Sequence, residues 1–147
     1  MSLDPQLIKQ LTISAGMITA TMLVHALFVV SAAMVFRGTA VRSRGIVRAF
    51  RDIVVLVILG VWLMSAHLVE IGLWAHLFLH LGLFESLEPA LYFSASSYTT
   101  IGFGDVLIAP EWRLLSGACG AAGLLMFGLS AAFLFDSISK LDLNGRH

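Results

Sequence analysis

Three long apolar segments alternate with polar stretches along the chain, at residues 11–36, 53–73 and 112–135. The first segment contains 26 residues. A helix of that length rises roughly 39 Å, and the other two segments also match or exceed the ~30 Å hydrocarbon core of a bilayer. The pattern therefore predicts three transmembrane helices.

A shorter segment lies between the second and third spans. The apolar character of the second span continues to Phe84, so we expect this helix to project beyond the membrane or to bend near Gly82. Residues 85–98 predict a short helix with Ser86 as N-cap and Pro89 in its first turn. About a dozen residues cannot cross a bilayer. This helix must lie outside the membrane, or enter it and return.

Composition agrees with a chain that lies within the bilayer. Hydrophobic residues make up 59% of the sequence and charged residues only 12%, with a formal net charge of zero. A soluble domain carries far more charge, so the chain is predicted to be an integral membrane protein without a nucleic-acid partner. The single cysteine, Cys119, excludes an intrachain disulfide and a cysteine-based zinc cluster.

Charge is concentrated in the predicted loop 37–52. This loop holds five arginines: Arg37, Arg42, Arg44, Arg48 and Arg51. Arginines in a short loop at membrane ends indicate its cytoplasmic side, where they contact lipid headgroups. We therefore expect the N-terminus outside and the C-terminus in the cytoplasm, in a plasma membrane or a bacterial inner membrane.

The stretch TTIGFGD, residues 99–105, follows the short helix directly. Irregular backbone at membrane depth occurs only where it is buried in protein or lines a water-filled pore. Gly102 and Gly104 can adopt positive φ at little cost, so alternating backbone here can direct successive carbonyls to one side. The C-terminus of the preceding helix adds a partial negative charge. Both features favour a dehydrated monovalent cation.

This stretch, with the short helix before it and a span on either side, resembles the pore loop of the potassium channel family, whose filter sequence is T-V-G-Y-G followed by Asp. The resemblance extends over residues 53–135. It implies rings of carbonyl oxygens that bind K⁺, with the Thr100 hydroxyl at the inner site. The implied ion-binding residues are Thr100, Ile101, Gly102, Phe103 and Gly104. The side chains of Ile101 and Phe103 would pack away from the ion, and Asp105 would lie at the outer mouth.

Several residues around the implied filter differ from the family pattern. Tyr92 and Phe93 stand where the family often has paired tryptophans, and Ser96 stands where some members have glutamate. Phe103 lacks the hydroxyl of the usual tyrosine. The predicted filter support consists of Tyr92, Phe93, Ser96, Thr99 and Asp105. With fewer polar contacts around it, we expect this filter to be less rigid than is usual in the family.

The resemblance also implies an all-α membrane protein that assembles as a tetramer, with a re-entrant pore helix and filter loop. We divide the chain into an extra span with its loop (1–52), a pore module (53–136) and a short tail (137–147). Gly128, or less favourably Gly123, is the candidate gating hinge. Expected partners are membrane lipid, three further copies and a separate regulatory subunit. K⁺ is the only expected cofactor, and no enzymatic activity is expected.

The remaining polar residues lie mainly on the second span. His67 and Glu70 are i, i+3 neighbours that we place near the outer interface, as a pH sensor or as interfacial residues. His76 and His80 lie further out, and a metal is the alternative for this group. His25 on the first span and Cys119 are expected to be packing residues. No span has the periodic arginines of a voltage sensor.

Three other functions remain open. The same fold could conduct cations without selectivity, and the chain could serve as an accessory subunit of a larger channel. A small helical bundle could instead hold a metal or haem with His25, His67, Glu70, His76 and His80. The last alternative leaves TTIGFGD without a role.

Overall fold

The computed structural model describes residues 4–38 and 46–143, excluding the side chains of residues 36–38 and 142–143. Helix α1 is Pro5–Gly38, α2 is Ile46–His80, α3 is Leu87–Tyr98 and α4 is Arg113–Leu143, preceded by the 3-10 turn η1, Pro110–Trp112. Within these residues, three helices are long and apolar enough to cross a membrane. The chain is therefore an all-α integral membrane protein, as predicted.

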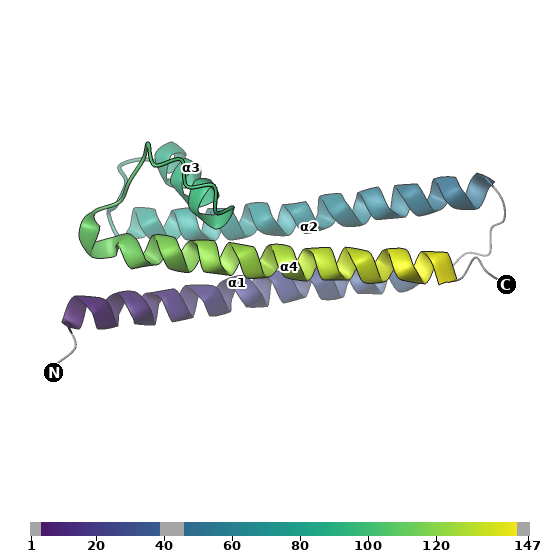
Figure 1. Cartoon of the computed structure of the whole chain (residues 1–147), viewed down its shortest axis with the longest axis horizontal. Coiled ribbons are helices and arrows are strands. Elements are labelled where there is room, and N and C mark those ends of the chain that lie inside the picture. The colour runs from purple at the N-terminus through teal and green to yellow at the C-terminus, as the bar shows by residue number, and fades with distance from the viewer. Residues whose placement is uncertain (1–3, 39–45, 144–147) are drawn as a thin grey trace.

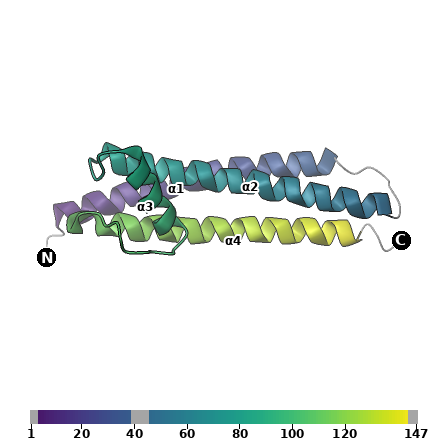
Figure 2. The ribbon, with the colours of Figure 1, turned by 90° about the horizontal axis from the view of Figure 1, so that it is seen from above.

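The long helices lie side by side, with α2 antiparallel to α1 and α4 (Figure 1). The start of α1, the end of α2, all of α3 and the start of α4 lie at one end of this bundle (Figures 1 and 2). Helix α3 crosses α2 and α4 at that end and contacts both. The short helix and the loop after it are thus placed between the second and third long helices.

The arginine-rich segment was predicted as a loop over 37–52, and this is wrong for Arg37 and Gly38, which belong to α1, and from Ile46 onward. Helix α2 begins at Ile46, so Arg48 and Arg51 lie in its first turns. An i, i+4 ion pair of 3.5 Å joins Arg48 to Asp52 and favours helix here. Arg48 also donates a hydrogen bond of 2.6 Å to the carbonyl of Leu141 on α4. Arg42 and Arg44 lie outside the described residues.

The predicted polar tail, 137–147, is also helical as far as Leu143. Ser137 is buried and its hydroxyl bonds the carbonyl of Phe133, one turn earlier. The i, i+4 pair of Lys140 with Asp136 supports the same turn. Polar residues therefore extend α4 beyond its apolar span rather than ending it.

Helix α2 ends where the sequence predicted a break, near Gly82. The amide of Leu83 donates to the carbonyl of Phe78 at 3.0 Å, and that of Gly82 to Leu79 at 2.9 Å. Gly82 has a φ of 70°, which completes a Schellman motif. The chain turns here into α3, whose N-cap position is Ser86, although the Ser86 side chain makes no capping bond.

The apolar core lies beneath α3, where α2, α3 and α4 meet. Aromatic rings dominate it, and burial of such rings supplies much of the packing energy. Its buried members are Trp74, Phe78, Phe93, Tyr98, Ile108, Leu115, Cys119, Ala122 and Met126. Cys119 is buried among them, as predicted.

Helix α1 is joined to this bundle by polar contacts along its length. The Gln10 side chain accepts a bond of 3.2 Å from the amide of Leu114 in the first turn of α4, where helix amides need partners from outside the helix. The indole of Trp74 donates to Thr21 at 3.2 Å. The first span is therefore integrated into the same bundle as the other helices.

Candidate functional site

The C-terminus of α3 lies deep beside α4. A Cβ atom placed on Gly123 would lie 1.9 Å from the carbonyl oxygen of Tyr98, so the two backbones are in direct contact. Gly123 is ten residues beyond the start of α4 at Arg113. Ten helical residues span roughly 15 Å, about half of a ~30 Å hydrocarbon core. The loop that follows Tyr98 therefore begins about half the thickness of a hydrocarbon core in from the start of α4.

The backbone of this loop alternates in conformation. Thr100, Gly102 and Gly104 have φ values of 61°, 60° and 81°. Thr100 is the one non-glycine residue at positive φ among the described residues. A β-branched residue in this region is strained by about 1–3 kcal/mol, and such strain is concentrated at functional sites. The alternation expected from the two glycines is present and includes Thr100.

Hydrogen bonds hold one side of the loop against α3. The amide of Gly102 donates to the carbonyl of Ser96 at 3.2 Å. The amide of Phe103 donates to the Ser96 hydroxyl, also at 3.2 Å. In a trans peptide the preceding carbonyl points opposite to the amide. The carbonyl oxygens of Ile101 and Gly102 therefore point away from α3, as a cation-binding column requires.

Tyr92 supports the outer part of the loop. Its hydroxyl donates to the Asp105 carboxylate at 2.7 Å, and its ring is stacked with Phe103 at 6.2 Å between centroids. This hydrogen bond, together with the negative charge of Asp105, raises the pKa of Tyr92 above its ordinary value. Phe93 instead lies in the core, with its ring 5.3 Å from that of Phe78. Of the two residues at the tryptophan positions, Tyr92 is thus the one that contacts the loop.

Thr99 belongs to the end of α3 rather than to the exposed loop. Its hydroxyl and its amide both donate to the carbonyl of Ala95, at 2.7 and 3.0 Å. These bonds satisfy a carbonyl at the last turn of the helix. Thr99 therefore anchors the start of the loop to α3.

A family model described as "Ion channel" matches residues 54–140, which is more than half of the chain. The chain belongs to this ion channel family. The match agrees with the resemblance noted from the sequence, and it makes the protein a membrane-embedded transport protein. No curated protein and no solved structure matches the chain.

The channel buries the residues that the sequence placed near the outer interface. His67 is 3% exposed and Glu70 is fully buried. Both lie inside the helix bundle rather than on its surface, and α2 continues to His80, ten residues beyond Glu70. Glu70 consequently lies at the depth of Tyr98, whose hydroxyl donates a short hydrogen bond to its carboxylate.

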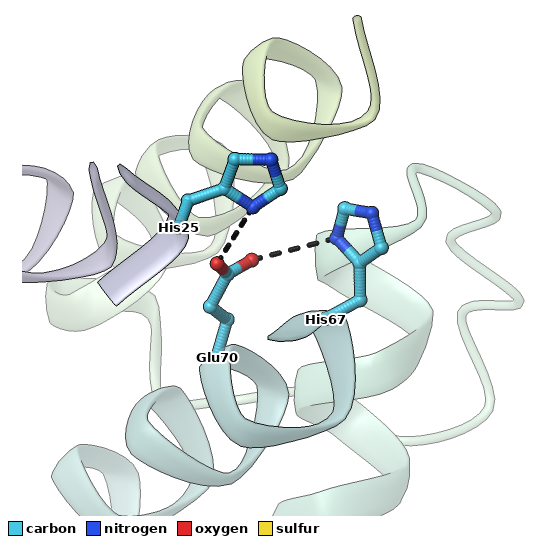
Figure 3. A group of neighbouring side chains, drawn as sticks. All are labelled: His25, His67 and Glu70. Carbon is cyan, nitrogen blue, oxygen red and sulfur yellow. Dashed lines mark hydrogen bonds and ion pairs between the residues drawn. The ribbon is translucent and has the colours of Figure 1, made fainter. Parts of the chain in front are cut away.

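His25 was expected to be a packing residue, but the channel uses it as a polar partner. Its Nδ1 lies 2.9 Å from one Glu70 oxygen, while Nδ1 of His67 lies 3.4 Å from the other (Figure 3). Sequence reasoning missed Tyr98 and Ser130, which also bond these groups. The position of Tyr98, directly before the loop, was the one signal available for either.

His76 and His80 do not join this buried group. Both are exposed on the last turns of α2. Among the described residues, the side chains close enough to share a metal ion are His25, His67 and Glu70, whose ligand atoms lie within 4.8 Å of one another. The site of four histidines and Glu70 considered for a metal or haem bundle is therefore not assembled in the described part of this channel.

The two candidate hinge glycines of the channel differ in their surroundings. Gly123 is required for contact with the Tyr98 backbone. No atom lies within 4 Å of a Cβ placed on Gly128. Of the two candidate hinge glycines, packing within the chain therefore accounts for Gly123 and not for Gly128.

Proposed function

We propose that the protein is a potassium-selective channel that conducts K⁺ passively through a filter made by residues 100–104 of four chains. The observation that carries this proposal is the alternating backbone at Thr100, Gly102 and Gly104, with the carbonyls of Ile101 and Gly102 directed away from α3. Consecutive carbonyl rings replace the hydration shell of K⁺.

The surroundings of the loop favour a cation at the same place. Helix α3 ends at Tyr98, and its C-terminal carbonyls carry a partial negative charge toward mid-depth. The Thr100 hydroxyl would complete the innermost ion site, and the carbonyls of residues 100–103 would form the successive rings. Several weak sites in a row permit conduction by repulsion between adjacent ions.

A single chain supplies one strand of such a filter, so four copies are needed to close it. The side chains of Ile101 and Phe103 are 59% and 65% exposed in the isolated chain. Packing against neighbouring copies would bury them and fix the width of the filter. In this homotetramer α4 lines the inner pore, and Gly128 is the proposed hinge.

The proposed orientation places the loop and the N-terminus outside the cell. These two parts lie at the same end of the bundle, and Arg48 and Arg51 lie at the other (Figure 1). The arginine end is assigned to the cytoplasm of a plasma or bacterial inner membrane. Lipid surrounds the bundle, and a separate regulatory subunit remains a candidate trigger.

The test is cation flux into proteoliposomes that contain the purified chain alone. We expect K⁺ flux without Na⁺ flux, and loss of K⁺ flux in Gly102→Ala, because the added Cβ is strained at a φ of 60°. Gly60→Ala is the matched control, since Gly60 lies on α2 in open space. Equal K⁺ and Na⁺ flux would assign the fold to a non-selective cation channel. Absence of both flux and tetramers would favour an accessory subunit.

A further inference from the structure

Five buried side chains from all four α-helices form a closed hydrogen-bonded ring. Glu70 contacts His25 at 2.9 Å, and His25 contacts Ser130 at 3.2 Å. Ser130 contacts His67 at 3.1 Å, and His67 contacts Tyr98 at 3.2 Å. The Tyr98 hydroxyl closes the ring on the second Glu70 oxygen. Figure 3 shows how both histidines face the two oxygens of one carboxylate.

The five contacts of the ring fix how many hydrogens its side chains share. Each of its five contacts needs one hydrogen. The number matches one hydrogen each from a carboxylic acid, a phenol, a serine hydroxyl and two neutral imidazoles, which together give five. The hydrogens can be redistributed, for example as a carboxylate with one imidazolium, but the net charge stays zero. A ring without net charge can be buried among apolar helices without an external counter-ion.

The ring is connected to the proposed filter through Tyr98. Tyr98 is the last residue of α3, directly before Thr99, and its carbonyl contacts the backbone at Gly123. Its hydroxyl is held by Glu70 and His67 on α2. Any displacement of Tyr98 therefore moves the point from which the filter backbone starts.

His25 is the ring member that lies outside the part of the chain matched by the ion channel family. The match begins at residue 54, and His25 is on α1. Without its imidazole, one Glu70 oxygen and the Ser130 hydroxyl lose a partner in a buried site. An unpaired buried polar group costs more than a hydrogen bond contributes, so the surrounding helices must adjust.

We propose that His25 of the first span is a positioning residue for the selectivity filter, acting through Glu70 and Tyr98. The inference rests on the proposed function, since it assigns the first span a part in holding the filter. Cys119 on α4 is the other titratable group against Tyr98, and it makes its own contact of 3.8 Å with the carbonyl of Ser94. The ring, and not α1 packing in general, transmits the effect of His25.

The test compares three variants in the assembled protein. His25→Leu removes both hydrogen bonds at similar volume, whereas His25→Asn keeps an amide donor near the position of Nδ1. His76→Leu is the matched control, because it makes the same change at an exposed histidine of α2. The first readout is the K⁺ to Na⁺ permeability ratio from reversal potentials. The second is hydrogen–deuterium exchange of the amides of residues 99–103 in nanodiscs.

We expect His25→Leu to lower the permeability ratio and raise the exchange rate by roughly tenfold each, the factor that corresponds to about 1.4 kcal/mol. His25→Asn should restore most of both, and His76→Leu should leave both unchanged. Ser130→Ala, which opens the ring with little loss of volume, should act in the same direction. It replaces His25→Leu if that variant does not assemble.

Unchanged exchange in both His25→Leu and Ser130→Ala would overturn the inference, whatever the ion selectivity of the wild type. Non-selective flux in the wild type would refute the proposed function alone, because exchange does not depend on conduction. Elemental analysis supplies a further check. Stoichiometric zinc in the wild type that is lost in His25→Leu would replace the ring with a metal site and overturn the proposal.

Discussion

Substitution of Gly123 by alanine should separate α4 from the end of α3. The new Cβ would lie 1.9 Å from the carbonyl oxygen of Tyr98, 2.7 Å from its carbonyl carbon and 2.9 Å from Cγ of its side chain. Two of these atoms belong to the backbone and cannot move by a side-chain rotation. The strain must be relieved by a shift of the helices themselves.

The size of this shift follows from the contact distance. Ordinary van der Waals contact begins at 3.4 Å, so the 1.9 Å approach is short by 1.5 Å. Overpacking of a close-packed site typically costs about 1–3 kcal/mol, and a backbone clash lies at the upper end. Alanine gains about 1 kcal/mol over glycine from helix propensity. The steric term therefore exceeds the propensity gain, and we expect net destabilisation of about 1–2 kcal/mol.

The assay is the thermal stability of the purified oligomer, followed by K⁺ flux in proteoliposomes. Gly123→Ala should lower both, because the displaced atoms belong to Tyr98 directly before the loop. Gly117→Ala is the matched control on the same helix, where open space leaves only the propensity gain. Gly120→Ala, with a nearest atom at 3.1 Å, should lie between them. Wild-type stability and flux in Gly123→Ala would refute the close approach of α3 and α4. Normal gating in Gly128→Ala would end the hinge proposal.

Three further predictions concern the support of the loop. Ser96→Ala removes the hydroxyl that accepts a hydrogen bond from the Phe103 amide, a bond worth about 1 kcal/mol. We expect faster inactivation of this variant in single-channel recordings. Unchanged inactivation kinetics would contradict the expectation. Tyr92→Phe removes the bond to Asp105 and should have a similar effect. Because Asp105 raises the pKa of Tyr92 above 10.0, the wild-type bond should persist at pH 10 and be lost only at higher pH, which ultraviolet titration of tyrosinate would follow.

The arrangement of the helices could be predicted from the sequence because membrane insertion depends on length and apolarity. Residues 11–36, 53–73 and 112–135 all lie within observed helices. The short helix could also be predicted from the sequence, since twelve residues between a glycine turn and a glycine-rich loop have few alternative conformations. The depth of this helix in the bundle could not be predicted, because it depends on the contact between Gly123 and Tyr98.

Helix ends were less predictable because polar residues can continue a helix outside the membrane. Ion pairs such as Arg48 with Asp52 extend α2 beyond its apolar part, and Lys140 with Asp136 does the same for α4. The hydropathy pattern predicts loop at these residues because the mean hydropathy falls there. Local i, i+4 pairing, worth only tenths of a kcal/mol, is enough when the rest of the helix is already formed.

The buried ring could not be predicted because it depends on how α1 and α2 are displaced along each other, which residue counts within each span do not give. Measured from the outer ends of the predicted spans, His25 lies fourteen residues deep and Glu70 only three. Measured on the observed helices, His25 lies twenty residues from the start of α1 at Pro5, and Glu70 lies ten residues from the end of α2 at His80. A carboxylate at that depth in a bilayer requires a partner on a neighbouring helix, since an isolated charge there is costly. Because α1 and α2 end at different levels, residue counts do not place His25 beside Glu70, and only the packed bundle shows that the first span supplies this partner.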